Sequence, residues 1–185
     1  TWGRARPDRA VLTVPESDPV LSLSWKTNED ALAWGRGTDG SFALVHGEIH
    51  NRQELRSFRQ TSDAPLNASI ALGLWRQEGP EGFGRINGPV SLSLWDARRR
   101  CLVLVRNRWG VPSLFFAEEA DCFVWSSEIA PLLALGLSTD LRTPALDTYL
   151  AWGYLPAPWT LVDSVEKLSP AHYLLRTPEE TTVTQ

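Results

Sequence analysis

The sequence predicts an α+β domain in which antiparallel sheets and helices are stacked in layers. Strand-like and helix-like blocks are segregated along the chain, in the order strands, helices, strands, helices, and do not alternate. The strand-like blocks are separated by short Pro-, Asp- and Gly-containing turns at hairpin spacing. A length of 185 residues suits one good-sized domain, and no internal repeat or low-complexity segment interrupts it.

The first quarter of the chain is predicted to be all strand, with short strands at residues 10–14, 20–25, 31–35 and 41–48. Residues 51–59 are polar and predict a helix. Asn67 is expected to cap the start of a second helix, which ends at Gly79-Pro80. Within that helix the apolar residues recur at helical spacing: Ile70, Ala71, Leu74 and Trp75. Two helices are therefore expected on one face of the sheets.

The second half of the chain predicts a hairpin with a buried partner strand. Apolar residues alternate with serines over 90–94, a turn follows at 96–100, and 101–105 is a continuous apolar run typical of a central strand. Further strands are expected at 113–117 and 122–126, and short helices after Glu128 and over 146–152. The domain is expected to span 1–176, and the polar end, 177–185, predicts a linker or an edge strand.

Composition narrows the function classes. A net charge of −4 and a pI near 5.4 argue against nucleic-acid and anionic-membrane partners, which require a dense basic surface. The run Arg98-Arg99-Arg100 fits a solvated turn. Cys101 and Cys122 lie in apolar strand-like runs, which favours buried free thiols and a reducing cytoplasm. No apolar run approaches a membrane span, and because Met is absent the natural N-terminus is open.

A series of motifs resembles class II glutamine amidotransferases of the asparagine synthetase type. The segment Gly47-Glu48-Ile49-His50-Asn51 is similar to their G-E-I-Y-N signature. Further matching blocks follow in the family's order: 79–81, 87–88, 94–96, 106–114, 127–133, 149–158 and 165–174. The resemblance covers roughly the last three quarters of the chain. It implies an N-terminal-nucleophile (Ntn) hydrolase fold, a four-layer αββα sandwich.

The resemblance also implies a role related to asparagine biosynthesis. Members of that family hydrolyse glutamine with an N-terminal Cys, whose α-amino group is the base, and pass the ammonia to an ATP-using domain. No cofactor is then expected in this domain, with ATP and Mg²⁺ handled only by a separate synthetase domain or subunit. Glutamine is the expected ligand if the pocket works, and a homodimer is left open.

The resemblance places five site residues. Thr1 stands where the nucleophile would be, since only the free amine is close enough to act as base. His46 replaces the Asn of the family's N-G-E motif, whose side chain and the backbone N–H of the next residue, here Gly47, form the oxyanion hole. Glu48 corresponds to the Glu that faces the ammonium group of glutamine. Asn67 replaces an Asp that neutralises the same group.

Other candidates are interpreted as structural. The family's Arg for the glutamine carboxylate has no clear counterpart, since Arg36 lies too near the motif and Arg4, Arg6 and Arg9 too far. His50 and His172 are expected to be structural, and Asp96 and Asn107 to be turn residues. Core packing is expected to explain most of the tryptophans at positions where the family has large hydrophobes: Trp75, Trp95, Trp109, Trp125 and Trp152.

Three hypotheses follow. The leading one is a domain that hydrolyses glutamine poorly, a pseudo-glutaminase that acts as a scaffold or docking module for a synthetase. β-Lactam synthetases resemble this family in the same way, with a glutaminase-like domain that lacks the Cys. The second is an active glutaminase whose N-terminal Cys is missing from this sequence, for which Arg6-Pro7-Asp8 resembles the family's R-G-P-D motif. The third is a non-catalytic amino-acid-binding module that uses Glu48.

Overall fold

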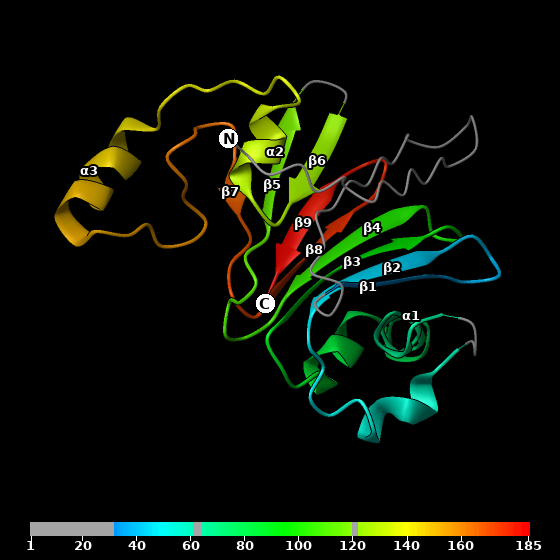
Figure 1. Ribbon diagram of the computed structural model, residues 1–185. Coiled ribbons are helices and arrows are strands. Elements are labelled where there is room, and N and C mark those ends of the chain that lie inside the picture. Colours follow the sequence, from blue (N-terminus) through cyan, green and yellow to red (C-terminus); the bar gives the residue numbers. More distant parts are fainter. Residues whose placement is uncertain (1–31, 61–63, 120–121) are drawn as a thin grey trace, which may run out of the picture.

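The computed structural model describes residues 32–60, 64–119 and 122–185. The strands predicted at 10–14 and 20–25 lie outside the described residues, as does Thr1. The described chain forms two antiparallel sheets between helical layers (Figure 1). In Figure 1 helix α1 lies below the larger sheet, and α2 lies beyond the smaller one. The predicted four-layer αββα architecture is confirmed.

The larger sheet has the strand order β1-β2-β3-β4-β8-β9. Its strands are β1 (Leu32–Arg36), β2 (Phe42–Gly47), β3 (Val90–Asp96), β4 (Cys101–Arg106), β8 (His172–Arg176) and β9 (Thr181–Thr184). The smaller sheet has the order β6-β5-β7, from β5 (Phe115–Glu119), β6 (Cys122–Ser126) and β7 (Glu166–Lys167). All the pairings are antiparallel. The polar end contains an edge strand, β9, paired with β8.

The helices differ from the prediction in detail. The segment expected as a helix over 51–59 contains only a 3₁₀ helix, η1 (Glu54–Phe58). Helix α1 (Leu66–Glu78) is followed directly by a second 3₁₀ helix, η2 (Gly79–Arg85), so Gly79-Pro80 ends the α-helix without ending helical structure. The short helices are α2 (Ile129–Leu133) and α3 (Thr143–Trp152). Neither they nor any other helix of the described chain is long and apolar enough to cross a membrane.

Strand alternation creates three core layers, because successive side chains point to opposite faces of a sheet. In β2, Ala43 and Val45 belong to the cluster between the larger sheet and α1, while Phe42 and Leu44 face the smaller sheet. A third cluster lies between the smaller sheet and α2, around Leu132. The smaller sheet is thus apolar on both faces, as a middle layer must be.

Buried polar and aromatic groups mostly match the prediction. Trp75 and Trp95 are buried, and Trp125 is half-buried and donates to Ser93 Oγ at 2.8 Å. The expectation of core packing is wrong for two others, since Trp109 is 68% exposed and Trp152 is 62% exposed. Trp109 lies in the turn after β4, and Trp152 is the last residue of α3, so neither is covered by the larger sheet.

Cys101 is a free, buried cysteine, as expected. It opens the central strand β4 and packs in the cluster beneath α1. Burial raises the pKa of its thiol to about 11. The group is therefore protonated at neutral pH and suits packing better than nucleophilic chemistry.

Candidate functional site

The residues of the N-G-E-like motif lie at the C-terminal end of β2. His46 continues the alternation of Phe42 and Leu44, so its side chain belongs to the face turned toward the smaller sheet. Its register partner on β3 is Ser91, which is buried. Glu128, the residue before α2, is close enough to act electrostatically on His46. The structure thus brings β2, β3 and the start of α2 together at this end of the sandwich.

His46 is half-buried, and burial lowers the pKa of its imidazole despite the opposing charge of Glu128. The ring is therefore neutral at pH 7. A neutral imidazole has one N–H donor and one acceptor nitrogen. His46 can offer one hydrogen bond to an oxyanion, but no positive charge.

Gly47 and Gly88 allow two chain segments to lie in close contact. Gly47 has φ +102°, and a Cβ there would meet the Pro89 carbonyl oxygen at 2.0 Å. A Cβ on Gly88 would meet the Glu48 carbonyl oxygen at 2.1 Å. Backbone hydrogen bonds join the same segments, from Glu48 N to Pro89 O (3.2 Å) and from His50 N to Asn87 O (2.7 Å). No larger residue fits at either glycine.

Two asparagines hold the 87–89 loop in place. Asn51 accepts from the backbone N–H of Asn87 at 2.9 Å and donates to the Arg85 carbonyl at 2.9 Å. Asn107 donates from Nδ2 to the Gly88 carbonyl at 2.6 Å. Asn51 belongs to the matched motif and Asn107 was expected to be a turn residue, but neither was predicted to hold this loop. The Asn87-Gly88 block was the available signal, since a motif glycine often marks a close approach of two backbones.

Glu48 is exposed just beyond β2. Asn67 belongs to α1, on the opposite side of the larger sheet from the His46 side chain. The expectation that Asn67 caps α1 is wrong. Pro65 is the N-cap residue, without a side-chain cap, and Asn67 is already inside the first turn. The proline fixes the helix start before the asparagine is reached.

The other predicted residues take structural positions. Arg36 is the last residue of β1 and pairs with Phe42. Leu32, at the other end of β1, pairs with His46, so Arg36 lies about 13 Å along the strand from the residue beside His46, at about 3.3 Å per residue. His50 is exposed, and His172 Nδ1 lies 2.7 Å from the Pro170 carbonyl oxygen. Within the described ranges no group of three or more His, Cys, Asp and Glu side chains could hold a metal ion.

A cavity of about 410 Å³ lies beside η2, at one end of β3, β4 and β8. Its walls include Val90, Leu92 and Val105, whose side chains belong to the cluster on the α1 side of the larger sheet. The predicted glutamine-site residues, His46 and Glu48, do not line it. The cavity and the motif therefore lie on different faces of the same sheet.

Comparisons with known proteins agree with the motifs. A family model described as a glutamine amidotransferase domain matches residues 36–185. A putative glutamine-hydrolyzing asparagine synthetase of Mycobacterium tuberculosis is 31% identical over 148 residues, covering 74% of this chain and 23% of the relative. The amidase chyE of Penicillium rubens is 28% identical, covering 75% of this chain and 20% of the relative.

A solved structure supports the fold. Glutamine phosphoribosylpyrophosphate amidotransferase from Bacillus subtilis superimposes with a TM-score of 0.54 at 12% identity, covering 82% of this chain and 30% of that one. The chain spans only about a fifth to a quarter of the curated relatives described above. With the family model matching from β1 to the last residue, the chain belongs to the glutamine amidotransferase domains of the asparagine synthetase family, with an Ntn hydrolase fold.

Proposed function

We propose that this domain hydrolyses glutamine poorly or not at all and serves as a scaffold for an ATP-dependent, amide-forming synthetase. The observation that carries the proposal is His46. It lies near the end of β2 with a neutral ring, and by the motif resemblance it replaces the family's oxyanion-hole asparagine. Gly47 is retained beside it, and its backbone packs closely on Pro89.

The rate of glutamine hydrolysis is expected to be low because the oxyanion of the intermediate would be poorly stabilised. The tetrahedral intermediate of glutamine hydrolysis needs donors placed where its charge develops, and removing one side-chain donor from such a hole costs about 2.7–4 kcal/mol, or roughly 10²–10³ in rate. An imidazole differs from an amide in shape and reach. His46 is therefore a poor replacement for the asparagine.

Glutamine recognition is weakened as well. By the motif resemblance a neutral Asn67 stands in place of the family's carboxylate, and a charge-assisted hydrogen bond to an ammonium contributes about 1.5–3 kcal/mol. Its helix lies across the sheet from the His46 side chain. Glu48 would be left as the carboxylate facing the substrate amine.

The proposal assigns ATP and Mg²⁺ to a separate synthetase domain or subunit, in the cytoplasm. Support comes from chain length, since relatives named as asparagine synthetases are several times longer than the part matched here. The free, buried thiol of Cys101 adds support for a reducing compartment.

The test is a glutaminase assay on the natively expressed protein, with its N-terminus identified by intact mass and Edman sequencing. We expect no glutamate release above a protein-free blank and no N-terminal Cys. A mature N-terminal Cys, together with glutamate release that an electrophilic glutamine analogue abolishes, would support an active glutaminase instead.

The alternative of a non-catalytic amino-acid-binding module is tested by calorimetric titration with glutamine and asparagine. That alternative predicts micromolar affinity without turnover.

A further inference from the structure

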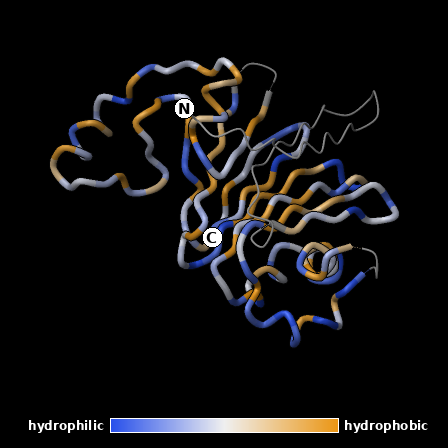
Figure 2. Tube along the Cα trace, in the orientation of Figure 1, coloured by the Kyte–Doolittle hydropathy of each residue, from blue (hydrophilic) through white to orange (hydrophobic). Residues whose placement is uncertain are grey.

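Helix α3 and the loop that follows it carry large apolar side chains into solvent. We define the α3 patch as Tyr149, Leu150, Trp152, Tyr154 and Trp159. Leu150 is 74% exposed and Trp152 is 62% exposed, and Ala145 is the buried residue of this helix. In Figure 1 the helix projects at the left edge of the molecule, away from both sheets, and Figure 2 shows hydrophobic residues along the same projection.

Hydrogen bonds and an ion pair hold the two ends of the segment that carries the α3 patch together. The backbone N–H of Arg142 donates to the Leu161 carbonyl at 2.9 Å, and Arg142 Nε lies 3.0 Å from Asp163 Oδ1. Gly153, with φ +75°, ends the helix, and its N–H donates to the Tyr149 carbonyl at 2.8 Å. The Trp152 and Tyr154 rings lie 5.9 Å apart. The patch is therefore held in shape before any partner binds, which reduces the entropy lost on association.

The near absence of charged residues around the α3 patch restricts the kind of partner that can bind it. Between Thr143 and Leu161 the only charged residue is Asp147. Without lysine or arginine the segment offers nothing to lipid or nucleic-acid phosphates. Tyr and Trp are the residue types that most often dominate protein–protein binding energy. The chemistry of the patch fits an apolar protein surface.

The exposed area of the α3 patch and the length of the relatives indicate which protein surface covers the patch. The five side chains together expose on the order of 500 Å², enough for the apolar core of an interdomain contact of about 600–1,500 Å². The chain spans only 23% of the asparagine synthetase relative from M. tuberculosis. Such relatives therefore carry a much larger part that this domain must accompany.

We propose that the α3 patch is the surface on which the synthetase part docks, an inference that rests on the proposed scaffold function and adds the place of contact. Tyr149 and Trp152 lie on one stripe of the helix and Leu150 beside them, so a shallow apolar groove on the synthetase is the complementary shape. The docked side chains would then be withdrawn from water.

The test is site-specific photocrosslinking in the complete gene product in its own host. Leu150→p-benzoylphenylalanine places the probe in the patch. Val111→p-benzoylphenylalanine is the matched control, because Val111 is also apolar and 58% exposed but lies in the loop between β4 and β5. After irradiation the crosslinked peptides are sequenced by mass spectrometry.

We expect the probe at 150, and not the probe at 111, to crosslink to a sequence with an ATP-dependent synthetase fold, in the same chain or a partner subunit. A Trp152→Ser exchange in the same protein should reduce the crosslinked fraction at least tenfold. Crosslinks to a second copy of this domain, to a non-synthetase protein, or equally from both positions would overturn the assignment of the patch.

The same experiment distinguishes a wrong docking surface from a wrong scaffold function. If a synthetase co-purifies with the domain, or is fused to it, but position 150 crosslinks elsewhere, the docking surface is wrong and the scaffold function stands. If no synthetase is fused to the domain or associates with it, the scaffold function fails and the patch assignment fails with it.

Discussion

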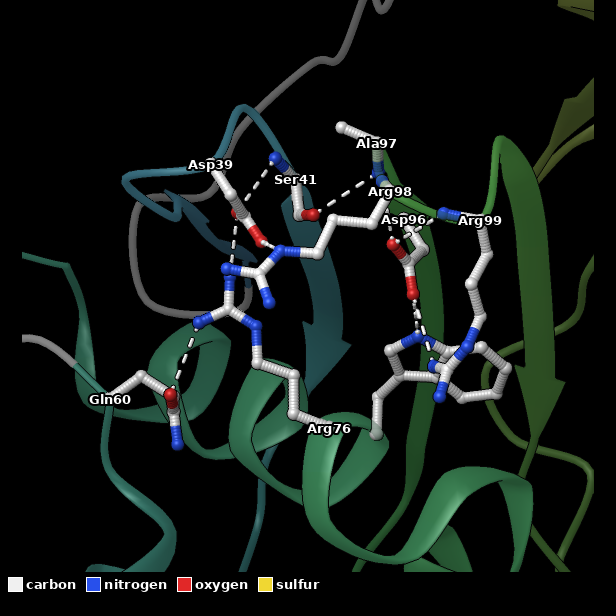
Figure 3. A network of polar contacts seen from close by, with 9 residues as sticks. Asp39, Ser41, Gln60, Arg76, Asp96, Ala97, Arg98 and Arg99 are labelled. Carbon is white, nitrogen blue, oxygen red and sulfur yellow. Dashed lines mark hydrogen bonds and ion pairs between the residues drawn. The ribbon is translucent and has the colours of Figure 1, made fainter.

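Trp75 donates from its indole Nε1 to Asp96 Oδ2 at 2.7 Å, which joins α1 to the end of β3 through two buried side chains. The other carboxylate oxygen of Asp96 accepts the backbone N–H groups of Arg98 and Arg99 at 2.9 and 3.1 Å (Figure 3). Arg99 adds an ion pair at 3.1 Å. One carboxylate therefore fixes both the hairpin turn and helix α1.

Replacing Asp96 should destabilise the fold. Asp96→Ala leaves the Trp75 indole N–H buried without a partner and removes the turn contacts, for an expected loss of about 2–3 kcal/mol in the free energy of unfolding. Urea denaturation measures it. Asp147→Ala, an exposed carboxylate on α3, is the control and should change stability by less than about 0.5 kcal/mol. Equal effects of both variants would mean that the network contributes nothing specific.

Acid stability should depend on the same carboxylate. Burial alone would raise the pKa of Asp96, but the Trp75 hydrogen bond, the two backbone N–H groups and Arg99 lower it below its ordinary value. A lowered folded-state pKa gives stability that is complete above the unfolded pKa of about 3.9 and is lost as pH falls below it. Stability curves of wild type and Asp96→Asn between pH 5 and 2.5 should therefore converge toward low pH. Parallel curves would contradict this.

His46 should make the free energy of unfolding depend on pH below about 6.5. Burial lowers its folded-state pKa, so protonation favours the unfolded chain, and stability falls as pH drops below the ordinary imidazole value of about 6.5. In His46→Asn that slope should flatten, while His50→Asn, at an exposed site, should keep the wild-type slope. Thermal midpoints across this range provide the measurement. An unchanged slope in His46→Asn would show that the ring is not buried as described.

The glycines of the motif should tolerate no side chain. Gly47→Ala and Gly88→Ala would each place a Cβ near 2 Å from a backbone oxygen, at positive φ, and we expect losses above about 2 kcal/mol for each. Gly84→Ala is the control, since nothing lies within 4 Å of its Cβ position. Chemical denaturation of the three variants gives the comparison, and near-wild-type stability of Gly47→Ala would rule out the close packing of 47–50 on 87–89.

Much of the fold could be predicted because local patterns matched their final environment. The serine–apolar alternation of 90–94 became β3, and the apolar run 101–105 became the central strand β4. The segment 51–59 lacked such a pattern, and only a 3₁₀ helix formed there. Pro65, two residues before Asn67, set the start of α1, so a capping rule applied to Asn67 alone gave the wrong position.

The site could be predicted only in part. The motif singled out His46, Gly47 and Glu48, but the hydrogen bonds that join Asn51 and Asn107 to a loop more than 15 residues away in sequence are tertiary contacts that no local pattern contains. The exposure of Trp152 was missed for a related reason. Its position in a family motif says that the residue is large and apolar, but not whether the surface that covers it belongs to this domain.

The most direct test of the central claim is steady-state glutamate release from glutamine by the natively expressed protein, with His46→Asn alongside. The account predicts no release above the blank for the wild type. Glutamate release by the wild type that is blocked by an electrophilic glutamine analogue, and that changes by about tenfold or more in His46→Asn, would contradict it and make His46 a working member of an active oxyanion hole.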